Sequence, residues 1–257
     1  MSDHLAEGVR RRYGVPDERL RVICRGIDTR RFDPASVDRH RVETLAQRWR
    51  ARPGVKIVML PTRGVRGTGH RLLLQAIGKL RRGRFLCLIV AGSERRAHGI
   101  DGTESLIGAL GLGGVVGMVG PCDDLPAALM LADVVVVPSP AAFGSVSRVA
   151  VKAQAMGKPV VATDVGGLGE TLIAAATGWL VEPDHADTLA QALELALAMP
   201  DEARARLALR ARRCGPGASR PATSPSSRRA MRPCRSIASC LKACRRMPTI
   251  SPVDRPP

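Results

Sequence analysis

Short apolar runs alternate with stretches of helical periodicity from residue 21 to residue 200. A buried strand appears in the sequence as a short apolar run, whereas a helix has apolar residues three and four positions apart. The length and spacing of the apolar positions therefore distinguish strands from helices. The runs that predict strands are Arg21–Arg25, Lys56–Pro61, Arg84–Ala91, Val115–Val119, Asp133–Pro138, Pro159–Thr163 and Gly178–Val181. The stretches that predict helices lie at 36–51, 70–82, 102–111, 124–132, 147–156, 169–176 and 185–199.

Several predicted strands are apolar at every position, as in the run of four valines Val134–Val137. Such a strand is buried on both faces, and a parallel sheet between two helix layers provides that burial. Strand–helix–strand repetition with short loops also implies right-handed crossovers. We therefore expect an α/β fold with a doubly wound, Rossmann-like and mostly parallel sheet. Ligands of such sheets bind beyond the carboxyl ends of the strands, so functional residues are expected in the strand-to-helix loops.

Composition divides the 257-residue chain near residue 213. Residues 214–257 hold nine Arg or Lys, one acidic residue, eight prolines, four cysteines and no aromatic residue, with neither strand nor helix periodicity. Because it has no apolar face to bury, this segment is predicted to be a basic, disordered tail. Residues 35–213 are predicted to form one Rossmann-like domain, and residues 1–34 lead into it.

The net charge of +17 bears on which partners can bind. Aromatic residues make up only 2% of the chain, so it lacks the platforms on which single-stranded nucleic acids stack their bases. No specific nucleic-acid partner is expected for that reason. The Arg-rich tail leaves one alternative function open, which is salt-sensitive binding to an anionic polymer. An unselected disordered extension explains the same composition.

The sequence predicts no secretory signal and no transmembrane segment. The N-terminal residues are charged, and the longest uncharged run, Ser105–Cys122, contains six glycines. The three cysteines before residue 213 are widely separated, and those of the tail lack the paired spacing of a zinc site. We therefore expect a cytoplasmic protein without a metal site, with peripheral contact at the inner face of the membrane left open.

The glycine-rich loop between Pro61 and His70 has the features of an anion-binding site. Its three glycines let the backbone approach a ligand, and the free N–H groups of a helix N-terminus attract an anion. Arg63 and Arg66 add guanidinium groups that can bind phosphate in a bidentate manner. It is not a P-loop, because His70 and Arg71 stand where Lys and Ser or Thr are required. A solvated glycine turn with surface arginines is the alternative.

Two further strand-to-helix loops carry weaker signals. The loop over 138–147 leads into a helical stretch that ends at Gly157, and a generic connection explains most of its composition. The loop over 163–170 clusters Gly166 and Gly167 before Glu170. Its backbone N–H groups can bind a phosphate or a sugar, or the loop is simply a tight turn.

Taken in order, these motifs resemble the C-terminal, nucleotide-sugar-binding domain of glycosyltransferase family 4, the group 1 glycosyltransferases of GT-B type. The motifs that carry the resemblance are Gly26–Pro34, Arg63, Ile89–Gly92, the stretch 120–139, Phe143–Gly144, Ala153–Gly157, Pro159–Val160, Gly166–Gly167 with Glu170, and Gly178–Val181. The resemblance implies transfer of a hexosyl or other glycosyl group from a nucleotide sugar to a glycan, lipid or small-molecule acceptor, with retention of configuration. It implies no cofactor and commonly no metal; a UDP-sugar and a GDP-sugar are equally compatible donors.

The resemblance places the family's phosphate-binding positions on the first loop. Arg63 falls on the phosphate-binding Arg, and Thr68 falls where the family has a phosphate-binding Lys. Arg66 and Gly69 belong to the same donor-binding loop. Thr68 therefore departs from the family pattern. Arg66 or Arg71 can supply the positive charge of the missing lysine.

The family's two glutamates, which accept hydrogen bonds from the sugar and ribose hydroxyls, fall on Ala141 and Lys152. Phe143 and Gly144 follow the first of these positions, and three residues, Ser145–Ser147, stand as an insertion before the second. No carboxylate is present at either position, even if strict spacing moves the first to Gly144. In the third loop the resemblance marks Gly166, Gly167 and Glu170 as donor-site positions. No catalytic residue is assigned.

The resemblance further predicts that the chain is truncated. Residues 1–34 look like a remnant of the interdomain segment and of the strand that leads into the domain, and the tail looks like a frameshifted continuation. The chain is therefore expected to be inactive alone, with a separately encoded acceptor domain as a partner beside the nucleotide sugar. A non-catalytic nucleotide-binding or partner module is the alternative.

Overall fold

The described part of the chain, in a computed structural model, comprises residues 3–23, 26–62, 69–80, 84–91, 102–140, 148–174 and 176–214. Its strands are β1 (Lys56–Thr62), β2 (Phe85–Ala91), β3 (Val116–Val119), β4 (Val134–Val137), β5 (Val160–Thr163) and β6 (Gly178–Val181). They form one parallel sheet in the order β3-β2-β1-β4-β5-β6. The order reverses where β4 returns to pair with β1, and this confirms the predicted doubly wound sheet.

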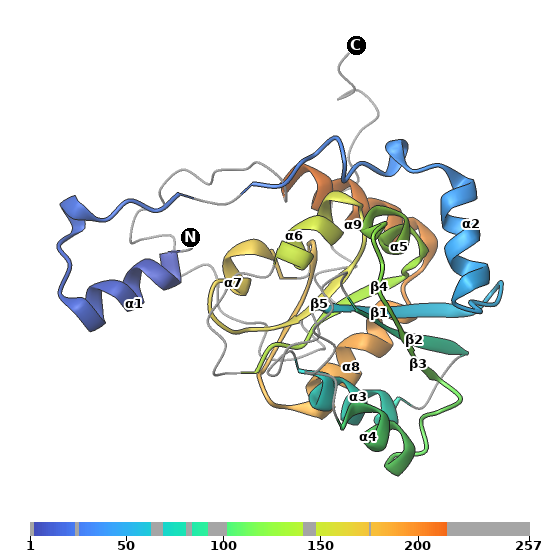
Figure 1. Ribbon diagram of the computed structural model, residues 1–257. Helices are drawn as coiled ribbons and strands as arrows, with labels where there is room; N and C mark the ends of the chain where they lie inside the picture. Colours follow the sequence, from blue (N-terminus) through green and yellow to red (C-terminus); the bar gives the residue numbers. More distant parts are fainter. Residues whose placement is uncertain are drawn as a thin grey trace.

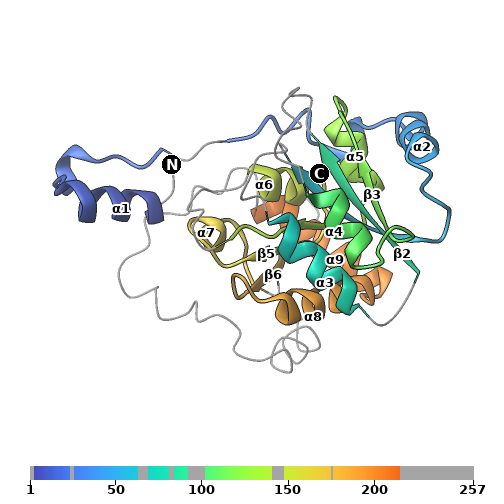
Figure 2. The ribbon, with the colours of Figure 1, turned by 60° about the horizontal axis from the view of Figure 1, so that its bottom comes forward.

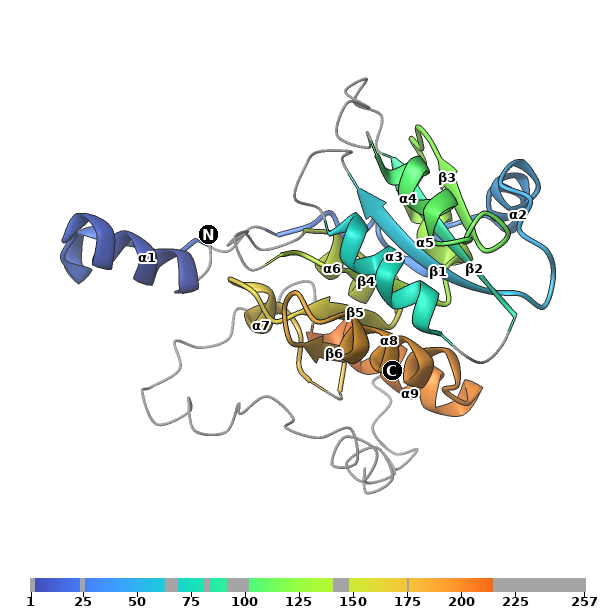
Figure 3. The ribbon, with the colours of Figure 1, turned by 90° about the horizontal axis from the view of Figure 1, so that it is seen from below.

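Helices cover both faces of this sheet (Figure 1 and Figure 2). One layer is formed by α3 (His70–Lys79), α4 (Thr103–Ala109) and α8 (Ala186–Leu197). The other layer is formed by α2 (Arg39–Arg48), α5 (Leu125–Leu131) and α6 (Arg148–Ala155), with the short α7 (Leu168–Thr171) beside α6. Helix α1 (Asp3–Tyr13) lies apart from both layers in all three ribbon views (Figure 3).

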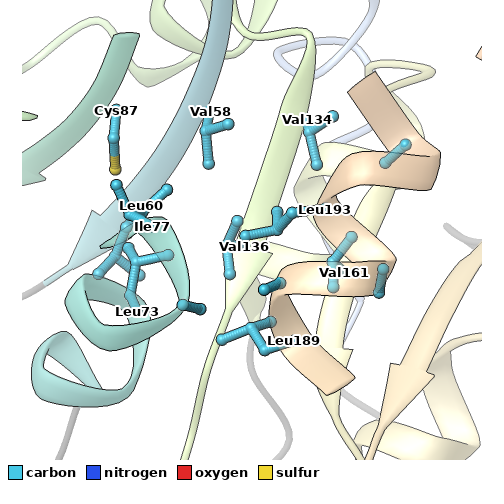
Figure 4. Packing of buried hydrophobic residues seen from close by; sticks show 14 of the residues in the cluster. Val58, Leu60, Leu73, Ile77, Cys87, Val134, Val136, Val161, Leu189 and Leu193 are labelled. Atoms are coloured by element: carbon cyan, nitrogen blue, oxygen red, sulfur yellow. The ribbon is translucent and has the colours of Figure 1, made fainter. Parts of the chain in front are cut away.

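The continuous apolar runs are explained by the burial of alternate residues on opposite faces. Val134 and Val136 of β4 face the layer of α3 and α8, where they meet a cluster that includes Leu73 and Leu193 (Figure 4). Val135 and Val137 belong instead to the cluster under α5 and α6. All four valines of β4 are buried, as a central strand requires.

Two predicted elements are wrong as stated. Residues 21–23 of the predicted strand Arg21–Arg25 are not a strand, because no strand of the described sheet pairs with them. The helix predicted over 169–176 forms only as α7 and stops at Thr171. Leu172 is already extended, and the backbone N–H of Ile173 donates to the Thr177 hydroxyl, so the chain turns toward β6.

Helix α9 (Asp201–Cys214) was not predicted from the sequence. It buries few apolar residues, so its hydrophobic positions form no periodic pattern. Arg204 in its first turn donates to the carbonyls of Ala196 in α8, at 3.2 Å, and Asp133, at 2.7 Å. Farther along, Ala208 packs against Gly157 after α6. Helix α9 therefore bridges the two helix layers. Within the described residues, none of the helices is long and apolar enough to cross a membrane.

A group of cations surrounds Asp133 at the amino-terminal edge of the sheet. Lys56 Nζ lies 3.2 Å from its carboxylate, Arg204 binds its carbonyl, and Lys158 Nζ donates to the nearby carbonyl of Met130 at 2.8 Å. Burial, which Asp133 offsets only in part and Arg204 reinforces, lowers the pKa of Lys158 from 10.5 to about 8. The protonated form of this lysine is thus destabilised in the native state.

The pKa of Lys158 gives a prediction for the pH dependence of stability. The unfolded chain holds this proton up to about pH 10.5 and the folded chain releases it near pH 8, so the contribution of Lys158 to the free energy of unfolding rises with pH between those values. We expect Lys158→Met to stabilise the protein by about 1–3 kcal/mol at pH 7 and to lose that advantage toward pH 10. Urea unfolding of both proteins across this range measures the difference. Lys79→Met, at an exposed lysine, is the control, and an equal pH profile for both variants would contradict the assignment.

Candidate functional site

The reversal of strand order between β1 and β4 marks the point where ligands bind in sheets of this type. The loops that follow these two strands meet directly at this point. A Cβ atom added to Gly69 would overlap the carbonyl oxygen of Pro138 and lie 2.5 Å from its carbonyl carbon. The buried Thr163, at the end of β5, donates its hydroxyl to the Ser139 carbonyl at 2.6 Å and fixes the second loop.

Gly69 is the N-cap of α3 and has a left-handed backbone with φ +75°. A glycine cap contributes no side-chain acceptor to the first turn of α3, and the positive end of the helix dipole lies at Gly69. The next residue, His70, is buried, and burial lowers the pKa of its imidazole, which favours the neutral form. This geometry suits an anionic group such as a phosphate.

Several predicted site residues lie outside the described residues. They are Arg63, Arg66 and Thr68 in the first loop, and Ala141, Phe143 and Gly144 in the second. The described residues that flank both segments lie side by side, since β1 pairs with β4 and Gly69 contacts Pro138. The assignment of roles to these six residues therefore stays a prediction.

Lys152 is described, and it lies on α6 over the ring of Phe32, with Nζ 4.9 Å from the ring centroid. The guanidinium of Arg31 lies 5.7 Å from the same centroid. The half-buried Lys152 has a lowered pKa, chiefly through burial and then through the charges of Arg148 and Arg31. A cationic cluster thus stands where the resemblance places a hydroxyl-accepting glutamate.

The third predicted loop is a tight turn. Gly166 has φ +56°, and Gly169 leaves room for the carboxylate of Asp164, which would lie 2.9 Å from a Cβ atom. Glu170 is directed to the first turn of α1, where its carboxylate accepts the backbone N–H groups of Asp3 and His4 at 2.9 and 2.7 Å. The charge of Glu170 suits this position at a helix N-terminus.

Pro138 and Thr163 begin the second and third predicted loops, but nothing in the sequence showed that they contact Gly69 and Ser139. Arg31 and Phe32 were not singled out as site residues. Phe32 carried a signal, because it belongs to the run Gly26–Pro34, but nothing in that run pairs it with a lysine on α6. An open hollow of about 590 Å³ adjoins the cluster; its lining residues are Arg30, Arg31, Ser36, Arg41, Asp123, Asp124 and Pro126. Across the described ranges, no three His, Cys, Asp or Glu side chains gather to hold a metal ion.

These observations define a Rossmann-like α/β domain with an anion-suited helix N-terminus at the reversal of its strand order. Residues 42–213 match the family described as Glycosyl transferases group 1. The chain belongs to this family.

Similar proteins agree with the family. D-inositol 3-phosphate glycosyltransferase from Salinispora tropica is 36% identical over 216 residues, which cover 75% of this chain and 41% of the relative. The crystal structure of a glycosyltransferase from Rickettsia africae has a TM-score of 0.76 at 28% identity, covering 83% of this chain and 56% of that one. Anabaena HepE, solved with UDP-glucose, shares the fold with a TM-score of 0.67 at 24% identity, covering 78% and 53%. The chain thus spans less than half the length of the Salinispora relative.

Proposed function

We propose that this chain is the donor-binding part of a glycosyltransferase and binds a nucleotide sugar at the carboxyl edge between β1 and β4. The observation that carries the proposal is the contact of Gly69 with Pro138, which brings two loops and the N-terminus of α3 together at the reversal of strand order. Membership of the group 1 glycosyltransferases supports sugar transfer as the family activity. A UDP- or GDP-sugar is the substrate of the proposal, with no cofactor and no metal.

The diphosphate of the donor is proposed to lie at the N-terminus of α3. Arg63, Arg66 and Thr68 precede Gly69 in the same loop and supply charge and a hydroxyl. When the glycosidic bond breaks, negative charge grows on the diphosphate, and a fixed guanidinium and helix N–H groups stabilise it most at that moment. Anabaena HepE, with the same fold, was solved in complex with UDP-glucose.

The sugar end of this site lacks the carboxylates of the family pattern. Ala141 and Lys152 cannot accept hydroxyl hydrogen bonds in the manner of glutamate. We therefore propose that the chain binds the diphosphate better than the sugar and is inactive alone. The names of the relatives suggest a phosphorylated polyol as the acceptor class.

Titration calorimetry of the full chain with UDP, GDP and UDP-glucose tests this proposal. We expect binding that weakens with salt, and we expect Arg63→Gln to weaken it by roughly tenfold to a hundredfold, because a charge-assisted phosphate contact is lost. Arg39→Gln removes the same charge from an exposed residue of α2 that pairs with Glu43, and it should change little. No binding of any of these nucleotides, or an equal effect of both variants, would overturn the proposal.

A further inference from the structure

Three cations meet beside α6, and one aromatic ring holds two of them. The ring of Phe32 is only 5% exposed, so it is fixed in the core under α6. Lys152 Nζ and the guanidinium of Arg31 lie 4.9 and 5.7 Å from its centroid, within the range of cation–π attraction. Arg148 lies one helical turn before Lys152 and shares its face of α6. A fixed ring thus gathers side chains that would otherwise repel one another.

Within the described part of the chain, acidic side chains do not neutralise this cluster. Among the described residues, no carboxylate lies within ion-pair distance of Arg31, Arg148 or Lys152. Asp28 and Asp124 interact electrostatically with Arg31 at longer range. Both carboxylates already accept hydrogen bonds from other groups.

Asp28 accepts the backbone N–H groups of Arg30 and Arg31 at 3.0 and 3.1 Å. Asp124 is held by Arg41 in two hydrogen bonds of 2.8 and 2.7 Å. Asp123 lines the adjoining hollow together with Arg30, Arg31 and Arg41, and Asp33, next to Phe32, is paired with Arg212 at 2.8 Å. The balance of charge around Lys152 is therefore positive, and a bound anion would relieve the mutual repulsion of the cations.

We propose that Arg31, Arg148 and Lys152 form a subsite for a phosphate monoester carried by a substrate. Guanidinium and ammonium groups bind a phosphate dianion through charge-assisted hydrogen bonds, and the hollow beside Arg31 leaves room for the molecule that bears it. The subsite rests on the proposed function, which puts the substrates at this edge. A cation in place of a hydroxyl-accepting carboxylate is the same exchange by which dinucleotide sites select a phosphorylated ribose over a free one.

Two substrates can supply this phosphate, a nucleotide phosphorylated on its ribose or a phosphorylated polyol acceptor. Calorimetry with two matched pairs separates them: uridine 3′,5′-bisphosphate against UMP, and inositol 3-phosphate against inositol. We expect the phosphorylated member of one pair to bind better than its parent. Lys152→Gln should weaken that member about fivefold, Lys152→Glu should abolish the preference, and Lys152→Arg should keep it.

Lys79→Gln is the matched control, because it removes the same charge from a lysine that pairs with Asp187 on the opposite helix layer. A preference in the uridine pair assigns the subsite to the donor, and a preference in the inositol pair assigns it to the acceptor. If UDP binds and responds to Arg63→Gln while neither pair shows a preference, this inference fails and the proposed function stands. If none of UDP, GDP and UDP-glucose binds but inositol 3-phosphate does, through Lys152, the proposed function fails and the subsite stands. An equal effect of Lys79→Gln and Lys152→Gln would overturn the subsite.

Discussion

Replacing Gly69 with alanine is expected to lower the free energy of unfolding by roughly 2–5 kcal/mol. At φ +75° an L side chain is strained, and the new methyl group would overlap the carbonyl oxygen of Pro138. That carbonyl follows the buried strand β4, and Thr163 holds the next residue, Ser139, so it cannot move without displacing the end of the strand. Urea unfolding followed by tryptophan fluorescence measures the loss.

Gly54→Ala is the matched control for this substitution. Gly54 has the same φ of +75°, but nothing lies within 4 Å of the added Cβ atom. It should therefore show only the backbone strain, about 1 kcal/mol. The difference between the two variants isolates the contact between the loops after β1 and β4. Equal losses would mean that this contact does not hold the site together.

Leu193→Ala is expected to lower the free energy of unfolding by about 2–5 kcal/mol, because it leaves a cavity between α8 and the sheet. Leu193 is fully buried, and Figure 4 shows it beside Val136 of the central strand β4. Denaturant unfolding gives the change directly.

Leu209→Ala makes the same chemical change on α9, where the side chain is 58% exposed. It should alter the free energy of unfolding by no more than about 0.5 kcal/mol. If the two leucine variants lose the same stability, α8 does not pack on the sheet as described.

Prediction from sequence succeeds where the hydrophobic pattern of a single strand or helix is enough to identify it. β4 is recognisable because four consecutive valines can be buried only between two layers. α9 is missed because Leu207 and Ala211 are its buried apolar residues, too few to form a periodic pattern. Residues 21–23 of the strand expected at Arg21–Arg25 are not a strand, because an apolar run becomes a strand only when a neighbouring strand pairs with it.

The candidate site divides in the same way. Gly69 can be selected from sequence, because clustered glycines in a basic loop before a helix are typical of an anion-binding turn. The contact of Gly69 with Pro138 cannot be predicted from sequence, because this contact depends on the pairing of β4 with β1. The position of Lys152 is also found from sequence, as a departure from a family pattern. Its neighbours Arg31 and Phe32 are not.

The sequence by itself determined the parallel α/β class and marked the glycine-rich loop before α3 as a candidate anion site, because hydrophobic periodicity and glycine spacing act over a few residues. Only the tertiary structure decided which loops meet and which charges gather. Phe32 and Lys152 are 120 positions apart in the chain, and it is the packing of α6 over the core that brings the ring and the cation within 4.9 Å. Charged residues so far apart in the sequence can act on the same ligand only when packing against a shared core holds them close together.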